Sequence, residues 1–238
     1  MPDTLEDLVM MQPPTTERPL LGSMVLVVED SRHACEALRL ICQRSGARIR
    51  RAESLASAER HLRTYRPRLA VVDLGLPDGS GLDLIERLAK AEPRIDGIIA
   101  VSGDETLQPA ALAAGADAFL AKPLASVAQF QKTAVSLMPE GYRRVPITVG
   151  ATDEVTPDPI ALRDDLTLAA ELLRTGTDGP TLDYIAGFLE GLAKCTQRAS
   201  ISKIAGQLRK CAKAKSSQSE MNTLAIMIED EATALEPV

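Results

Sequence analysis

Aromatic residues are scarce in this chain of 238 residues: they make up 3% of it, as three Phe, three Tyr and no Trp. Proteins that hold single-stranded nucleic acid by stacking its bases need exposed aromatic rings, so the composition argues against that class. Hydrophobic residues nevertheless make up 45% of the chain and charged residues 25%, which is ordinary for a folded protein. The cores must therefore be built from aliphatic side chains.

Cysteine, histidine and long apolar runs are also lacking. The four cysteines form no C-x-x-C pair, which disfavours a zinc site or a disulfide framework. Only two histidines occur, His33 and His61. No run of 18 apolar residues could span a membrane, and the acidic N-terminus lacks the apolar core of a signal peptide. These absences predict a cytoplasmic protein with no membrane partner.

Short apolar runs alternate with helical patterns in the first half of the chain. Five runs are predicted to be strands, at residues 24–28, 47–51, 69–73, 97–102 and 118–121. Helical patterns follow them, at residues 31–45, 54–65, 81–91, 105–114 and 125–138. Three of the runs are almost continuously apolar, as in a parallel sheet covered on both faces. The alternation predicts an α/β fold with a five-stranded, doubly wound parallel sheet.

The second half is predicted to be a small all-α helical bundle. Apolar residues recur at helical spacing over residues 162–173, 182–193, 201–211 and 221–235, which indicates four amphipathic helices. Three prolines between residues 141 and 159 indicate a linker with one short extended piece. The predicted organisation is a flexible tail over residues 1–22, an α/β domain over 23–140, a linker over 141–159 and a bundle over 160–238.

Polar residues follow the predicted strands at the edge where ligands bind in parallel sheets. They are Glu29 and Asp30 after the first strand, Asp73 at the end of the third, Ser102 at the end of the fourth and Lys122 after the fifth. Carboxylates brought together repel one another, and a hard dication such as Mg²⁺ relieves that repulsion. One carboxylate of such a group can attack a phosphoryl group as a nucleophile. Asp73 is central in the sheet, so we expect it to be that nucleophile.

Four segments carry a resemblance to the receiver domain of two-component response regulators. They are VLVVED (25–30), VVDLGLPDGSGLDLI (71–85), AVSGDE (100–105) and GADAFLAKP (115–123). The resemblance covers about residues 24–138 and implies a flavodoxin-like fold. It implies that Asp73 accepts a phosphoryl group from a histidine kinase or a histidine phosphotransfer protein, and that no separate catalytic domain is needed.

The same resemblance implies further site residues. Glu29, Asp30, Asp73 and the backbone carbonyl of Gly75 would hold Mg²⁺, and Ser102 and Lys122 would contact the phosphoryl oxygens. A cis peptide between Lys122 and Pro123 would shape the site. Phe119 stands where the family commonly has Tyr, and would act with Ser102 as the switch.

The helical half leaves three interpretations open. Residues 185–214 resemble a histidine phosphotransfer domain, but Gly187 stands at the position of its histidine and Glu190 at that of its usual lysine. No histidine lies beyond residue 61, so this half cannot relay a phosphoryl group. A second interpretation is a module for self-association or for docking a protein partner. The third is DNA binding through the basic segment 194–215. It is disfavoured because the chain from residue 139 has 11 basic and 15 acidic residues.

Overall fold

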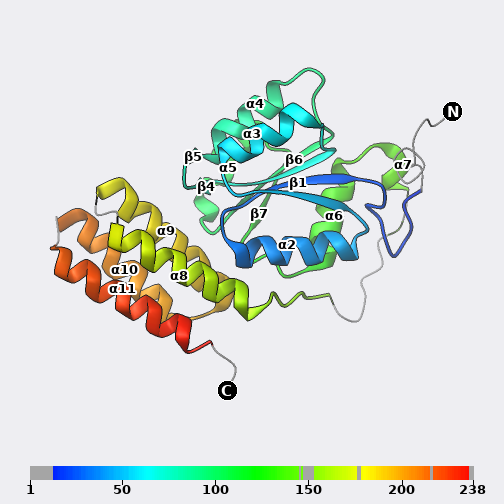
Figure 1. Cartoon of the computed structure of the whole chain (residues 1–238). Helices are drawn as coiled ribbons and strands as arrows, with labels where there is room; N and C mark the ends of the chain where they lie inside the picture. Colours follow the sequence, from blue (N-terminus) through cyan, green and yellow to red (C-terminus); the bar gives the residue numbers. More distant parts are fainter. Residues whose placement is uncertain (1–12, 145, 147–152, 176–177, 215–216, 236–238) are drawn as a thin grey trace. The chain divides into compact units, whose positions relative to one another are not determined.

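The computed structural model of the protein describes residues 13–144, 146, 153–175, 178–214 and 217–235 (Figure 1). It divides the chain into two compact units. The first consists of Met1–Asp30 and Ala37–Thr156, and the second of Ser31–Glu36 and Pro157–Val238. Within the described residues, no helix is both long enough and apolar enough to cross a membrane.

A five-stranded parallel sheet forms the centre of the first unit. Its strands are β1 (Met24–Val28), β2 (Arg48–Ala52), β3 (Leu69–Asp73), β6 (Gly97–Ser102) and β7 (Ala118–Ala121). They lie in the order β2-β1-β3-β6-β7, with all neighbours parallel. This is the flavodoxin-like order, which reverses between β1 and β3. The predicted fold class is confirmed.

Helices cover both faces of this sheet (Figure 1). Helices α3 (Leu55–Thr64), α4 (Gly81–Lys90) and α5 (Gln108–Ala113) lie on one face. Helices α2 (Arg32–Arg44) and α6 (Val127–Leu137) lie on the other. Every residue of β3 and β6 is buried, as expected for central strands covered twice. The core is aliphatic, with Phe130 the largest side chain among those fully buried.

Several details of the first unit differ from the sequence predictions. A two-stranded hairpin of β4 (Gly75–Leu76) and β5 (Gly79–Ser80) follows β3, where no strand is predicted. The helix predicted over 105–114 is instead a 3-10 turn, η1 (Glu105–Leu107), followed by α5. Pro109 explains this break, because proline lacks the N–H of a continuous helix and is favoured in a first turn.

The predictions for the tail and the linker also need correction. Leu20 is fully buried and its N–H donates to Ser45 O at 2.9 Å, so the tail is packed at this point rather than flexible. Residues 1–12 of the predicted tail and 147–152 of the predicted linker lie outside the described residues. A short helix, α7 (Glu140–Arg143), begins the linker region, and Val155 near its end is buried.

The described residues between 157 and 238 form four helices: α8 (Pro159–Thr175), α9 (Gly179–Thr196), α10 (Ala199–Ala214) and α11 (Gln218–Thr233). A continuous aliphatic cluster from all four helices fills their centre. Asp178 caps α9 by accepting a hydrogen bond from Thr181 N, and a capping box of Ser217 and Glu220 starts α11. The predicted helical C-terminal region is therefore confirmed.

Candidate functional site

The strand order brings three predicted acidic residues to one edge of the sheet. Glu29 and Asp30 directly follow β1, and Asp73 is the last residue of β3, which pairs with β1. The order of the strands reverses between β1 and β3, and such a switch point opens a crevice beyond the carboxyl ends of the strands. The three carboxylates therefore lie where α/β sheets bind ligands.

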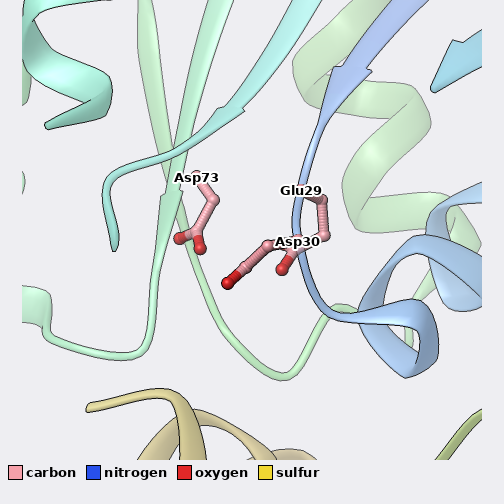
Figure 2. A group of neighbouring side chains, drawn as sticks. All are labelled: Glu29, Asp30 and Asp73. Carbon is pink, nitrogen blue, oxygen red and sulfur yellow. The ribbon is translucent and has the colours of Figure 1, made fainter. Parts of the chain in front are cut away.

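The carboxylates are close together. One oxygen from each of Glu29, Asp30 and Asp73 lies within 4.8 Å of the others, and Figure 2 shows the side chains gathered at the strand ends. Glu29 is 1% exposed and Asp73 is 7% exposed, while Asp30 is half-buried. Two of the three carboxylates thus lack most of their contact with solvent.

Lys122 brings a positive charge into this acidic group. Its Nζ atom lies 2.7 Å from Glu29 Oε2 and 3.2 Å from Asp73 Oδ2, with the lysine side chain 9% exposed. The backbone N–H of Lys122 donates to Ser102 O at 2.9 Å, which fixes the lysine next to the end of β6. The Lys122–Pro123 peptide bond is cis.

The electrostatics of the group show that its charges are not balanced. Burial raises the pKa of Glu29 well above its usual value; Lys122 lowers it, whereas Asp73 and Asp30 raise it further. Burial disfavours the charged form of Lys122, but Asp73 and Glu29 outweigh that effect and raise its pKa. One ammonium beside three carboxylates leaves an excess of negative charge.

A divalent cation fits this donor set. The ligands that Mg²⁺ prefers are carboxylate, carbonyl and water oxygens, and it typically takes one or two carboxylates. Three carboxylate oxygens within 4.8 Å of one another, with Asp30 half-buried, meet that requirement. Burial is the main reason that the pKa of Glu29 is high, and a bound dication would offset the repulsion from Asp73 and Asp30 that raises this pKa further.

The other predicted site residues lie around this group. Ser102 ends β6, is 7% exposed, and its Oγ accepts a hydrogen bond from Asp104 N at 3.1 Å. Gly75 is exposed and lies two residues after Asp73, at the start of β4. Phe119 is half-buried in β7 and packs against the core on the α3, α4 and α5 face of the sheet.

Gly81 allows the backbone after β3 to pass close to the carbonyl of Asp73. A Cβ atom at this first residue of α4 would lie 2.0 Å from the backbone oxygen of Asp73, so only glycine fits. The N–H of Gly81 donates to Leu74 O at 3.2 Å, which closes the loop back onto the end of β3. The resemblance to receiver domains also implies a turn at Gly81, and its contact with the Asp73 carbonyl is the physical reason for glycine there.

Asp153 contacts the start of α6, although no motif in the sequence predicts a role for it. Its carboxylate accepts hydrogen bonds from Ser126 Oγ at 2.5 Å and Ala128 N at 2.7 Å, at the start of the helix that follows Lys122. Ser126 is a recognisable helix cap in the sequence, but a partner 27 residues further on has no local signal.

Comparison with known proteins finds matches to the first unit. Residues 25–133 match the family model described as the response regulator receiver domain. A solved CheY-like response regulator receiver domain protein from Methanospirillum hungatei JF-1 is 24% identical, with a TM-score of 0.46. The match covers 51% of this chain and 97% of that one.

Two curated relatives are transcriptional regulators by name. The KDP operon transcriptional regulatory protein KdpE of Escherichia coli K12 is 34% identical over 158 residues, which cover 65% of this chain and 64% of that protein. The virulence transcriptional regulatory protein PhoP of Shigella flexneri is 37% identical over 101 residues, which cover 42% of this chain and 45% of that protein. The chain thus spans less than two thirds of either relative.

The names of these relatives do not support the expectation that nucleic acid is not a partner. The strand order of the first unit and its family match agree with the resemblance to a receiver domain. Residues 25–133 are a response regulator receiver domain of the two-component type.

Proposed function

We propose that the chain is a response regulator that accepts a phosphoryl group on Asp73 from a histidine kinase or a histidine phosphotransfer protein. The observation that carries this proposal is the carboxylate of Asp73 at the switch point, 3.2 Å from Lys122 Nζ and beside two further carboxylates. An Asp73 oxygen forms the new bond to phosphorus. The bond from phosphorus to the donor's histidine nitrogen breaks, and its electron pair stays on that nitrogen.

The neighbouring residues have distinct roles in this transfer. Glu29, Asp30, Asp73 and the backbone carbonyl of Gly75 would hold Mg²⁺, which neutralises charge on the transferring phosphoryl group. Lys122 pairs with a phosphoryl oxygen once Asp73 is modified, because its ammonium already lies between Asp73 and Glu29. Ser102 donates a hydrogen bond from its hydroxyl to another phosphoryl oxygen.

Modification of Asp73 shifts the receiver between two arrangements of the β6–β7 side. Ser102 moves toward the phosphoryl group, and Phe119 moves with it from its half-buried position. The ring of Phe119 has no hydroxyl, so its two positions differ only in packing. The conformational change that follows phosphorylation of Asp73 therefore involves a Phe119 ring that forms no hydrogen bond in either position.

The helical unit serves as a non-catalytic output module. Residues 160–238 contain no histidine, so this part of the chain cannot receive the phosphoryl group as a phosphoramidate, even though its four-helix architecture is the one expected of a phosphotransfer domain. Association with a second copy or with a protein partner is the role proposed for it. Residues 160–238 would form that surface.

Labelling with acetyl phosphate tests the proposal. The wild-type chain should incorporate one phosphoryl group in the presence of Mg²⁺ and none with EDTA, while Asp73→Asn should not be labelled under either condition. Asp83→Asn is a matched control, because Asp83 lies in the first turn of α4. Undiminished labelling of the Asp73→Asn variant, with its fold intact by circular dichroism, would overturn the assignment.

A second candidate is a transcriptional regulator that binds DNA through residues 194–215, and the names of the relatives favour it. In α10, Lys203 and Lys210 are exposed, whereas Arg209 is paired with Glu190. A mobility shift with duplex DNA that weakens steeply with salt and is lost in the Lys203→Ala/Lys210→Ala variant would support this candidate. The absence of a mobility shift at low salt would contradict DNA binding and support the protein-interaction role of the helical unit.

A further inference from the structure

Asp153 joins the linker region to the start of α6. Its side chain accepts hydrogen bonds from Ser126 Oγ at 2.5 Å and from Ala128 N at 2.7 Å, and its backbone oxygen accepts one from Val127 N at 2.8 Å. The first N–H groups of a helix have no partner within the helix. Asp153, which lies 25 residues after Ala128, therefore satisfies two of those of α6, the N–H groups of Val127 and Ala128.

The residues after Asp153 extend this attachment. Val155 N donates to Ala125 O at 3.0 Å, and Glu154 forms an isolated antiparallel bridge with Ser126. Val155 is 6% exposed, and the Glu154 carbonyl accepts a hydrogen bond from Arg44 Nη1 at 3.1 Å. We call these three residues, Asp153, Glu154 and Val155, the clip.

The clip lies at the far end of the loop that carries Lys122. At one end of this loop, Lys122 N donates to Ser102 O, which fixes the loop to β6. At the other end, the clip holds Ala125 and Ser126. Only Pro123 and Leu124 lie between these attached ends. The position of the Lys122 ammonium beside Asp73 thus depends on two anchors, and the clip supplies one of them.

The charge of Asp153 suits this position. A carboxylate at a helix N-terminus interacts favourably with the helix dipole and with the N–H groups there. The hydrogen bonds from Ser126 and Ala128 keep the pKa of Asp153 below its usual value, so it is ionised at neutral pH. The attachment therefore persists throughout the physiological pH range.

We propose that Asp153 is a positioning residue for phosphorylation: through the clip it holds the loop that places Lys122 beside Asp73, and it couples that loop to the linker. This inference rests on the proposed function of Asp73. The chain runs from the clip through Thr156 into Pro157, the first residue of the second unit's main segment.

The test compares Asp153→Ala, Asp153→Asn and Asp178→Ala in the full chain. Asp178→Ala is the matched control, because it also removes a carboxylate that accepts a hydrogen bond from a first-turn N–H, here that of Thr181 in α9. Labelling by acetyl phosphate and Mg²⁺ should be about 3- to 10-fold slower for Asp153→Ala than for the wild type. Asp178→Ala should label like the wild type. Asp153→Asn retains an acceptor oxygen for Ala128 N–H and should recover most of the rate.

Amide hydrogen exchange without a phosphodonor gives the second readout. Asp153→Ala should exchange faster at Leu124–Gln129 while the exchange of β1 and β3 stays unchanged. Wild-type labelling rates in the Asp153→Ala variant, or unchanged exchange at Leu124–Gln129, would overturn the inference. A wild-type chain that takes up no phosphoryl group, together with the expected exchange result, would refute the proposed function but not the anchoring of the loop.

Discussion

The ammonium of Lys122 lies 3.2 Å from Oδ2 of Asp73, although the two residues are 49 positions apart in the sequence. The sheet makes this meeting possible: Asp73 ends β3, Lys122 follows β7, and β6 pairs with both strands. The ammonium also contacts Glu29 at 2.7 Å, so it lies between two buried carboxylates. Its removal should therefore affect both stability and chemistry.

Lys122→Met should destabilise the receiver by about 3–5 kcal/mol without Mg²⁺, because two buried carboxylates lose their counter-charge. Mg²⁺ should restore part of this loss, because a dication bound there supplies the missing charge. Urea unfolding with and without Mg²⁺ measures both effects. Lys90→Met is the control: its partner Glu86 is exposed, so the cost should stay below about 1 kcal/mol. Equal costs for the two variants would contradict the described geometry.

Mg²⁺ affinity should rise with pH between the usual pKa of a glutamate and the raised pKa of Glu29 in the folded protein. Protons compete with the cation for the Glu29 carboxylate over this interval. Without Mg²⁺, the folded state holds this proton more tightly than the unfolded chain. Stability should therefore fall as the pH rises through the same interval.

Calorimetric titration with Mg²⁺ at several pH values measures this dependence. Glu29→Gln should remove most of it, because the amide does not titrate in this range. A pH-independent affinity in the wild type would contradict the role of Glu29 in the site.

Gly81→Ala should destabilise the receiver by about 1–3 kcal/mol or more, because the new Cβ would lie 2.0 Å from the Asp73 backbone oxygen. The displaced Asp73 should also be labelled more slowly. Gly187→Ala in α9 is the matched control: apart from the adjacent residues and the backbone of the helix itself, no atom lies within 4 Å of the new Cβ. Gly187→Ala should raise the stability of the protein by about 0.5–1 kcal/mol, because alanine favours the helix more than glycine does. Thermal unfolding followed by circular dichroism measures the stability of both variants. A Gly81→Ala variant as stable as the wild type would contradict the close approach of residue 81 to the Asp73 carbonyl.

Ser102→Ala should slow labelling by about 10-fold or more, because a hydrogen bond to a charged oxygen contributes roughly 1.5–3 kcal/mol. The fold should tolerate the change, since the Ser102 hydroxyl accepts only the bond from Asp104 N among those described. Ser136→Ala, which removes an exposed hydroxyl from α6, should leave the labelling rate unchanged. Equal rates for the two variants would remove Ser102 from the site.

The sheet and the acidic group were predictable because their signals are local. Central strands such as β3 and β6 are continuous apolar runs, and the charged residues of the site end a strand or lie within two residues after one. Parallel topology then brings these ends together without any further information. The close approach of Lys122 to Glu29 and Asp73 follows from that topology.

Other features depend on contacts between distant segments and could not be predicted. The β4–β5 hairpin has two residues in each strand, too few for a periodic pattern. The burial of Leu20 depends on its pairing with Ser45, 25 residues away, and the clip depends on Asp153 reaching Ser126. Prolines in the N-terminal tail and in the linker indicate irregular structure. They do not show whether the tail or the linker packs against the α/β domain.

The most direct test of the central claim is to locate the phosphoryl group itself. After reaction with acetyl phosphate and Mg²⁺, intact-mass measurement followed by peptide mapping of the borohydride-reduced chain identifies the modified carboxylate. The account predicts a single phosphoryl group per chain, in the peptide that contains Asp73. A modification confined to another residue, or no modification of a folded chain that binds Mg²⁺, would contradict it.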